Sequence, residues 1–572
     1  MTTEVEAPPA PSPRAVRSRP RRPRRSAAWA IARVEGRRLL RHPLFVLGAI
    51  VSVGLFGFVT WKAAPVLQAD AILIGGCLLP TAAMTLLAAN LAVLRSHRHG
   101  TDELYDGLAT TRAGRTAGHL LSVAWPAGFA LALTAVETIY LFFLGSVGRP
   151  SPFELLTGPA AVALFGVVGV AIGTWWQSVL IGPIALVAIG GAWLWVISHR
   201  NDGTLDLHAW LTPWVPALVN PEILIRPAAT HVVYLLGLCA LVGVVALARY
   251  DGWRRTGVGA VLALALVVVT AAVESKPPTP AQTAHLVALV EQPTRFQTCR
   301  TIEDVLYCAY PGYSGWIPRW NRVVAATLGP VPAGNRPQLE VRQTMWNDYW
   351  SDVPLSVQQR LESPTVRGVP RPPPDALTPG TAWGRAQSAG GYEFGLALSV
   401  AARAVGLPEA SAFSGSQSYC NAVGESRALI ALWLAANSSP EAAAALRRTA
   451  AREPYGTLEP GDPGVGSQTL YDVGGYAYQA EGNSSVDWGK AEVSYALQLL
   501  ERPAAQVRDM VASHWDELAA PGTTTAQAVR VLGLRALPTW AQVLTRTGKY
   551  TPSEVRIRAK NAQNSLRKLQ CR

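Results

Sequence analysis

The segment at residues 94–121 combines histidines with acidic side chains, which can bind a metal ion or transfer protons. It reads LRSHRHGTDELYDGLATTRAGRTAGHLL. A metal site in it would use the side chains of His97, His99, Asp102 and Glu103. The neighbouring cations Arg95 and Arg98 would repel a divalent ion, and no histidine pair has the helical spacing of a zinc site. We therefore predict no metal site, which leaves a solvated loop or a surface that contacts a partner.

Signatures of catalysis are absent elsewhere in the chain. It contains no HExxH, GxSxG or GxxxxGK[ST] motif, which excludes the zinc-peptidase, serine-hydrolase and P-loop ATPase chemistries that depend on them. Cys420, Asn421 and His514 could form a thiol enzyme, but nothing in the sequence places them together. A disulfide cysteine and a surface histidine is the simpler interpretation. We predict that the chain is not an enzyme and holds no metal or cofactor of its own.

An aromatic stretch, YCAYPGYSGWIPRW, occupies residues 307–320. Aromatic rings offer rigid apolar area with a polar tip, so the stretch could form a surface that contacts sugars or lipids. We favour the alternative, a tight, disulfide-supported turn packed on the core of a domain.

The composition indicates that these residues belong to a membrane protein. Of 572 residues, 49% are hydrophobic and only 16% are charged, where about 25% is usual in soluble proteins. The net charge is +13, but eleven arginines precede Pro43 and stand before an apolar run, which argues for membrane orientation and against nucleic-acid binding. Residues 1–26 are rich in proline and arginine, so we predict a disordered basic tail.

Seven apolar runs are long enough to cross a bilayer core of about 30 Å as helices. The predicted spans are 44–64, 69–94, 117–145, 153–175, 179–198, 230–247 and 257–273. Basic residues gather in 95–115 and 249–255, which places these loops and the N-terminus in the cytoplasm of a bacterial cell. Seven spans put everything after Glu274 outside the cytoplasm, whereas six would leave it inside.

One ionisable side chain, Glu137, lies deep within the third predicted span. Ionisable residues in such a setting are by default candidates for function. Glu137 could contact a polar substrate on a transport path, or it could bond to a neighbouring helix.

Cysteines give an independent indication of compartment. Cys77 and Cys239 fall within predicted spans, where they serve as small apolar side chains. The remaining four follow the last span, and an even set outside the cytoplasm suggests disulfides: Cys299, Cys308, Cys420 and Cys571. Of three possible connectivities we favour Cys299–Cys308 with Cys420–Cys571, and four free thiols are the alternative.

The second half, residues 275–572, has the pattern of a mainly helical soluble domain. PQLEVRQ at 337–343 alternates as a strand does. Apolar residues at three- and four-residue spacing predict helices at 392–405, 425–436, 440–452, 488–500, 504–518, 525–532 and 552–569. We expect the domain to handle a substrate or bind a partner.

The loop between the second and third spans predicts a short amphipathic helix. Thr101 can cap it, and Asp102 and Glu103 suit its positive first turn. Its apolar stripe consists of Leu104, Tyr105 and Leu108. Thr110 or Thr111 can cap the following helix, which begins near Arg112 and carries Arg115 and His119. A short helix of this kind can lie in a groove of a partner protein.

The order of these elements resembles the ABC-2-type permease family, the membrane subunits of ABC exporters. Residues 29–50 are similar to its amphipathic entry helix and first span, and 95–120 to its first cytoplasmic loop with a Gly-Thr-x-Glu-Leu element. Residues 207–227 resemble its broken outer helices between the fifth and sixth spans. The resemblance covers residues 27–250.

The resemblance implies an all-α membrane protein with a six-helix transmembrane bundle in residues 27–250. Residues 251–274 would add a seventh span, and 275–572 an extracytoplasmic, mainly helical domain. It implies a second permease subunit, identical or different, and separate ATP-binding subunits that hold ATP and Mg²⁺. The coupling element toward those subunits would be Thr101, Asp102, Glu103, Leu104, Tyr105, Leu108 and Arg112. The alternative is a membrane-anchored extracytoplasmic binding or sensor protein without a transport role.

Overall fold

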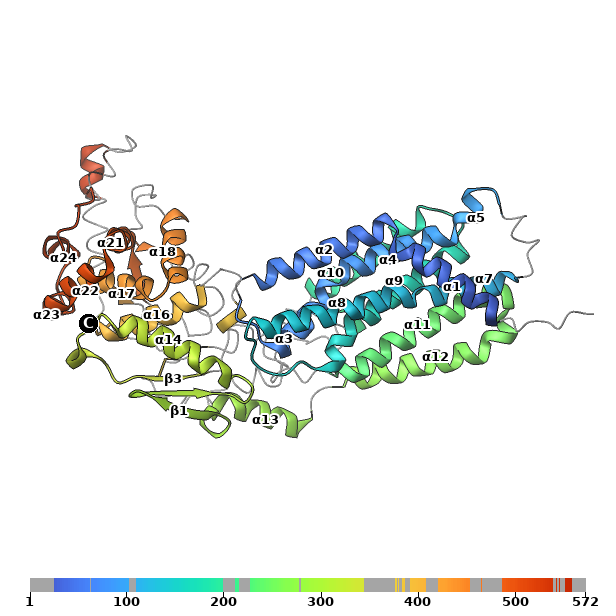
Figure 1. Cartoon of the computed structure of the whole chain (residues 1–572), viewed down its shortest axis with the longest axis horizontal. Coiled ribbons are helices and arrows are strands. Elements are labelled where there is room, and N and C mark those ends of the chain that lie inside the picture. Colours follow the sequence, from blue (N-terminus) through green and yellow to red (C-terminus); the bar gives the residue numbers. More distant parts are fainter. Residues whose placement is uncertain are drawn as a thin grey trace, which may run out of the picture.

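The structure, a computed structural model, has a helical bundle at one end and a second domain at the other (Figure 1). It describes residues 25–61, 63–101, 110–198, 211–214, 227–276, 279–343, 376–377, 379, 383–385, 391–407, 420–452, 464–465, 486–538, 542, 545 and 551–557.

Apolar helices form the bundle, and side-chain caps fix where several of them begin. His42, before α2, accepts the Leu44 amide, and Ser151, before α9, accepts the Glu154 amide. Proline at the next position, Pro43 and Pro152, suits a first helical turn. The elements are α1 (Arg25–Leu40), α2 (Pro43–Thr60), α3 (Leu67–Cys77), α4 (Leu79–Val93), α5 (Arg95–Arg98), α7 (Arg112–Ser122), α8 (Ala124–Phe143), α9 (Pro152–Trp175), α10 (Ile181–Ser198), α11 (Ala228–Asp251) and α12 (Trp253–Glu274).

Every predicted span falls on a helix, and six helical stretches in the described chain are long and apolar enough to cross a membrane. Two of them pair consecutive helices, α3 with α4 and α7 with α8. The fifth predicted span, 179–198, corresponds to α10, whose described apolar stretch, Ile181–Val196, is shorter than these six.

The centre of the bundle is the contact between α4 and α9. A Cβ on Gly169 of α9 would lie 2.2 Å from the Leu86 carbonyl oxygen of α4, so only glycine permits this approach. Small residues at helix contacts are the usual way for membrane helices to pack closely. Outward-facing side chains such as Val258 of α12 and Phe143 of α8 are 74% and 86% exposed, as expected of a surface that faces lipid.

Contacts of α10 show that it runs from one end of the bundle toward the other. A Cβ on its Gly182 would lie 2.3 Å from the Asn90 amide nitrogen near the end of α4. Near its other end, Trp193 donates to the Trp214 carbonyl at 3.0 Å, and Trp214 donates to that of Ile72 in α3 at 2.9 Å. Helix α10 therefore runs along the bundle beside the longer helices, and α1 lies at the opposite end from the second domain (Figure 1). We call these the α1 end and the domain end.

The second domain is mostly helical and carries two small sheets. The first sheet has the strand order β1-β2-β3-β4, in which β1 and β2 are antiparallel and the pairs β2–β3 and β3–β4 are parallel. The second sheet has the strand order β5-β7-β6. The strands are β1 (Thr298–Ile302), β2 (Val305–Ala309), β3 (Glu340–Arg342), β4 (Ala376–Leu377), β5 (Cys420–Asn421), β6 (Gly464–Val465) and β7 (Val486–Gly489). The helices are α13 (Pro280–Glu291), α14 (Ile317–Leu328), α16 (Gly391–Ala404), α17 (Ser426–Asn437), α18 (Pro440–Arg452), α21 (Lys490–Leu500), α22 (Ala504–Ser513), α23 (Trp515–Leu518) and α24 (Thr525–Val531). Short 3₁₀ turns are η3 (Pro293–Arg295), η4 (Ser314–Trp316), η5 (Ala333–Asn335) and η7 (Trp383–Arg385).

Most expectations for this half agree with the structure. The mainly helical character and the strand at 340–342 are confirmed. The predicted helix 504–518 is interrupted at His514, and of 552–569 only 552–557 is described, as helix. The hairpin β1–β2 was not predicted; it sets Cys299 opposite Cys308, and the predicted disulfide joins them. Cys571 lies outside the described residues, and of Cys420 only the backbone is described, so the second predicted pair stays a prediction.

The two parts share one hydrophobic core at the domain end. Val66 before α3 and Val147 after α8 form a β-bridge, and both belong to the core cluster of the second domain. The Ala64 amide donates to the Gly384 carbonyl at 2.7 Å, and the Arg319 guanidinium to the Leu144 carbonyl at 2.8 Å. The loops that end two of the long helical stretches are thus fixed to the second domain.

Candidate functional site at the α1 end

The predicted coupling residues flank or fall within a segment that the structure leaves undescribed. Asp102, Glu103, Leu104, Tyr105 and Leu108 lie outside the described residues. On the near side, the Thr101 amide and hydroxyl both donate to the Ser96 carbonyl, at 2.9 and 3.3 Å. This contact closes the turn of α5, so it supplies no evidence that Thr101 caps a following helix.

On the far side, α7 begins as predicted. The Thr111 hydroxyl accepts the Gly114 amide at 3.1 Å and is the N-cap. Arg112 is the first helical residue and is exposed, and Arg115 lies one turn further along. Of the two caps considered, Thr110 or Thr111, the structure uses Thr111.

Glu35 connects α1 to α5, the near flank of the loop. Its side chain is only 10% exposed, and it accepts contacts from Arg38 at 2.7 Å and from Arg95 of α5 at 2.9 and 3.0 Å. Arg38 stabilises the carboxylate within α1, whereas Arg95 comes from sixty residues away. The start of the loop is therefore held to α1 by a charge-assisted contact.

The far flank is held to α1 by close packing. A Cβ on Gly118 of α7 would lie 2.7 Å from the Ile31 Cγ2, and one on Gly36 of α1 would lie 2.0 Å from the Trp125 ring of α8. The buried face of α1 is formed by Ala32, Glu35, Gly36 and Leu39, at the three- and four-residue spacing of one helix face. Both flanks of the loop thus rest on the same helix.

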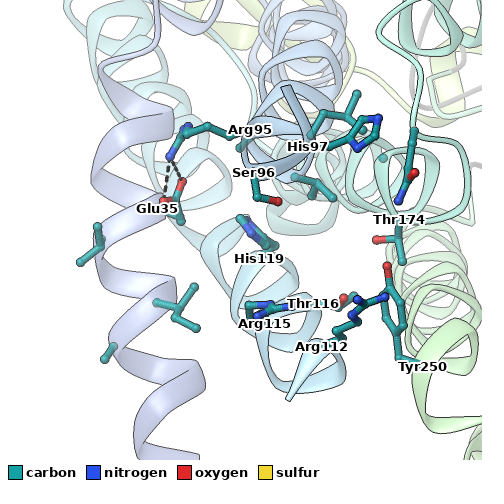
Figure 2. Close-up of a pocket in the computed structure, with 18 residues that line it drawn as sticks. Glu35, Arg95, Ser96, His97, Arg112, Arg115, Thr116, His119, Thr174 and Tyr250 are labelled. Atoms are coloured by element: carbon teal, nitrogen blue, oxygen red, sulfur yellow. Dashed lines mark hydrogen bonds and ion pairs between the residues drawn. The ribbon is translucent and has the colours of Figure 1, made fainter. Parts of the chain in front are cut away.

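A cavity of about 470 Å³ lies between these elements. Figure 2 shows Glu35 with Arg95 on one side of it, and Arg112 with Tyr250 on another. The lining residues are Ala30, Ile31, Val34, Glu35, Ala92, Val93, Leu94, Arg95, Ser96, His97, Arg112, Arg115, Thr116, His119, Gly173, Thr174, Gln177 and Tyr250. They combine arginines and hydroxyl groups with an apolar wall.

The histidines of the segment do not form a metal centre in the part of the chain that is described. His97 and His119 line the cavity, and His99 is exposed. No group of three or more histidine, cysteine or acidic side chains with suitable geometry occurs among the described residues. The lining of the cavity instead includes Arg95, Arg112 and Arg115, whose side chains do not ligate metal ions.

Close to the cavity, His42 caps α2 through its Nδ1, which accepts the Leu44 amide at 3.3 Å. Partial burial, and secondly the nearby Arg95 charge, lower the pKa of His42. A neutral imidazole keeps a lone pair for this cap, which the protonated ring would lose. The neutral form is therefore the one that the fold favours.

Glu137 lies in α8 and is only 4% exposed. Among the described residues, neither of its carboxylate oxygens has a hydrogen-bond partner, and the Thr134 hydroxyl one turn earlier has none either. Of the two roles considered, bonding to a neighbouring helix is therefore not realised in the structure. A buried carboxyl group without a partner is costly, so the position suits contact with a polar ligand.

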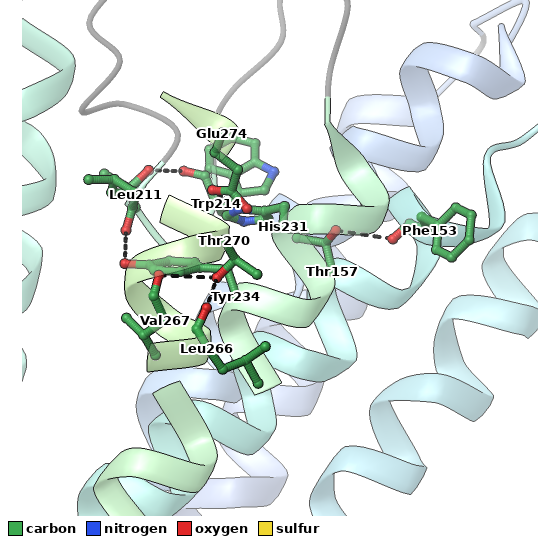
Figure 3. Close-up of polar contacts among 11 residues, drawn as sticks. Phe153, Thr157, Leu211, Trp214, His231, Tyr234, Leu266, Val267, Thr270 and Glu274 are labelled. Atoms are coloured by element: carbon green, nitrogen blue, oxygen red, sulfur yellow. Dashed lines mark hydrogen bonds and ion pairs between the residues drawn. The ribbon is translucent and has the colours of Figure 1, made fainter. Parts of the chain in front are cut away.

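A second polar cluster, not predicted from the sequence, lies in the bundle at the domain end (Figure 3). His231 of α11 and Glu274 of α12 are both buried, 3.4 Å apart. The Tyr234 hydroxyl donates to the Leu211 carbonyl at 3.2 Å, next to the Trp214 contact described above. The sequence signal was present, since His231 begins and Glu274 ends an apolar helix. The cluster fastens α12, which is otherwise mostly exposed to lipid.

In the second domain, the aromatic stretch 307–320 belongs to the core. Tyr310, Tyr313, Trp316 and Trp320 are each at most 1% exposed. The interpretation as a sugar- or lipid-contacting surface is therefore wrong, and the packed turn is what forms.

Of the residues considered for a thiol enzyme, His514 is described with its side chain. His514 is exposed, with its Nδ1 3.0 Å from the Met510 carbonyl. One buried acid of this region is Glu492, which accepts hydrogen bonds from the Gly424 amide at 3.1 Å and from the Thr525 hydroxyl at 2.5 Å. Burial raises the pKa of Glu492. The arrangement is structural, since it ties α21 to the starts of α17 and α24.

Comparison of the chain with models of protein families, with curated proteins and with solved structures gives no significant match.

Proposed function

We propose that the chain is the membrane-spanning permease subunit of an ATP-driven ABC transporter, working as an exporter in a bacterial cell membrane. A separate subunit would bind ATP and Mg²⁺ and would dock on the α1 end, with the loop 95–119 as the coupling element. This chain would not be an enzyme. A second permease subunit would complete the transport path.

The observation that carries the proposal is the attachment of both loop flanks to α1. Arg95 holds the near flank through Glu35, and Gly118 holds the far flank against Ile31. Displacement of residues 102–109 by a partner would therefore move α1, α5 and α7 together. The displacement would be transmitted to the bundle because no flexible linker separates the two flanks from α1. Coupling to ATP hydrolysis requires such a connection.

A route from this end to the other supports the same role. The helical stretch Arg112–Phe143 runs from the loop along the bundle. At its far end Leu144 accepts Arg319 of the second domain, and Glu137 lies two turns before that end. Motion of the stretch would change both the surroundings of Glu137, a candidate on the substrate path, and the position of the second domain.

The proposal places the α1 end in the cytoplasm and the second domain outside. Arginines at the α1 end support this orientation, among them Arg95, Arg112 and Arg254. The disulfide between Cys299 and Cys308 supports it too, since such bonds persist in oxidising compartments. A reporter that is active only outside the cytoplasm should be active when fused after Lys276, and inactivity there would exclude the orientation.

Affinity purification in mild detergent tests the proposal. We expect a Walker-type ATPase to co-purify with the chain, and Glu103→Arg or Leu104→Asp to reduce its recovery. Asp251→Arg is the matched control, since Asp251 is an exposed acid at the same end but on α11. Recovery of no ATPase under conditions that preserve membrane complexes would refute the proposal.

A membrane-anchored binding or sensor protein is the second candidate. The contacts of Ala64 with Gly384 and of Leu144 with Arg319 favour it, since a ligand held by the second domain could act on the bundle through them. On this reading the chain would retain function with no ATPase bound.

A further inference from the structure

Glu137 of α8 is a buried acid for which the described part of the chain supplies no cation. Its side chain is almost inaccessible, and neither carboxylate oxygen accepts a hydrogen bond from a described residue. No arginine or lysine among the described side chains of the bundle is buried, so none lies at hand inside it to balance this acid. A buried carboxylate without a partner is unfavourable, so a cationic group from outside the chain would stabilise it.

Thr134 adds a hydroxyl group beside this acid. It is buried one turn before Glu137 on the same face of α8, and its hydroxyl has no partner among the described residues. The hydroxyl of Thr138, by contrast, is used within the helix, since it donates to the Thr134 carbonyl at 2.8 Å. The face therefore presents three oxygen atoms that can accept hydrogen bonds, two of the carboxylate and one of the hydroxyl. A primary ammonium group has three N–H donors, which matches that number.

This face of α8 lies at the level of the break between α3 and α4. Ala130, one turn before the hydroxyl, belongs to the same core cluster as Leu78, the residue that separates the two helices. Leu141, one turn after the acid, belongs to the same cluster as Cys77, the last residue of α3. Pro80 in the first turn of α4 has no amide hydrogen to continue the helical ladder. Carbonyl groups at the end of a helix favour positive charge, so the break adds to the attraction for a cation.

The remaining surroundings are apolar and adjoin the surface that faces lipid. Phe56 of α2 packs in one cluster with Leu141 and meets the Tyr140 ring edge-on, with the ring centroids 6.1 Å apart. Val136 and Tyr140, which flank Glu137 along α8, are 62% and 47% exposed. Aromatic rings attract cations as well as apolar groups. A ligand for this position would therefore combine a cationic group with an apolar part that dissolves in the bilayer.

We infer that Glu137 and Thr134 bind the ammonium group of an amphiphilic amine, whose apolar part lies against Phe56 and Tyr140. Calcium and magnesium ions suit the position less well, because they take about six or more oxygen ligands and the side chains here offer three. The inference deepens the proposed function and rests on it in one respect, since such an amine would be the class of substrate that the exporter carries. Binding of the amine is a property of this chain alone, so it can be measured with no ATPase present.

Isothermal titration calorimetry on the full-length chain in detergent tests the inference. The probes are octylammonium, octan-1-ol and octanoate, which share one apolar chain and differ in charge. We expect octylammonium to bind more tightly than the alcohol or the carboxylate. Glu137→Gln should weaken octylammonium binding about tenfold or more, because charge-assisted hydrogen bonds are the strong ones. Thr134→Val keeps the shape and the carboxylate but removes one acceptor, so it should weaken binding about threefold.

Glu274→Gln is the matched control, since Glu274 is an equally buried acid toward the same end of the bundle but lies on α12 beside His231. It should leave the affinity for octylammonium unchanged. The valine variant keeps the test open if the glutamine variant does not fold. Equal affinity for amine and alcohol, full binding by Glu137→Gln or by Thr134→Val, or an equal loss in Glu274→Gln would overturn the inference.

The result is separable from that of the proposed function. Loss of amine selectivity in a chain that still recovers an ATPase would overturn the inference and leave the transporter standing. Selective amine binding by a chain that recovers no ATPase would support the site and refute the transporter.

Discussion

Replacing Glu35 and Arg95 by glutamine tests how the predicted coupling loop is held to α1. Glu35 is only 10% exposed, whereas Arg95 is 34% exposed and Arg38 57% exposed. A hydrogen bond between charged groups contributes about 1.5–3 kcal/mol when shielded, and solvent reduces that for partners as exposed as these. We therefore expect each single variant to lose about 1–2 kcal/mol, most of it from the Glu35–Arg95 contact.

The assay is thermal unfolding in detergent followed by tryptophan fluorescence. For a bundle of this size, about 1–2 kcal/mol corresponds to a fall in Tm of about 2–8 °C. The Glu35→Gln, Arg95→Gln double variant should lose about 1 kcal/mol less than the sum of the single losses, because both remove the same contact.

Arg98→Gln is the control, since Arg98 is exposed and ends the same helical turn as Arg95. It should change stability by less than about 0.5 kcal/mol. Additive losses in the double variant, or an equal loss in Arg98→Gln, would refute the role assigned to Glu35.

Three further predictions follow from the described contacts. Gly169→Ala places a Cβ 2.2 Å from the Leu86 carbonyl oxygen and should lower the free energy of unfolding by about 1–3 kcal/mol. Gly128→Ala, with open space at its Cβ, should lower it by less than about 0.5 kcal/mol in the same thermal measurement. Equal losses would contradict the tight α4–α9 contact. Cys308→Ser removes a disulfide that closes a loop of nine residues, which should cost the second domain about 2.5 kcal/mol in denaturant unfolding, and alkylation of Cys299 and Cys308 without prior reduction would show that the bond is absent. Because the folded state lowers the pKa of His42, the unfolded state takes up the proton first, so this contribution to stability should be full above the pKa of a free imidazole, about 6.5, and should fall as the pH drops below it. His42→Asn, which can still cap α2, should remove that part of the pH dependence of Tm, and an unchanged profile would exclude the cap role.

The apolar helices were predictable because each depends on a local property, a run of apolar residues long enough for a membrane. The cap at Thr111 was predictable too, since capping is decided within four residues.

Contacts between distant segments were not predictable. The hairpin β1–β2 has few residues per strand, and both its parallel neighbour β3 and the strand β4 that pairs with β3 come from further along the chain. The pairing of Glu35 with Arg95 and the approach of Gly118 to Ile31 depend on how α1 folds back across the bundle. The cavity, which draws its lining from several helices, follows from those contacts and not from any one motif.

The central claim is that residues 102–108 touch an ATP-binding subunit. A photo-crosslinking amino acid at Tyr105 of the full chain, in its own membrane, tests it most directly, with a second probe at Gly334, an exposed position of the second domain. We expect the Tyr105 probe to capture a protein with ATPase motifs and the Gly334 probe to capture none. Capture of no ATPase from Tyr105, or capture of one from Gly334, would contradict the account.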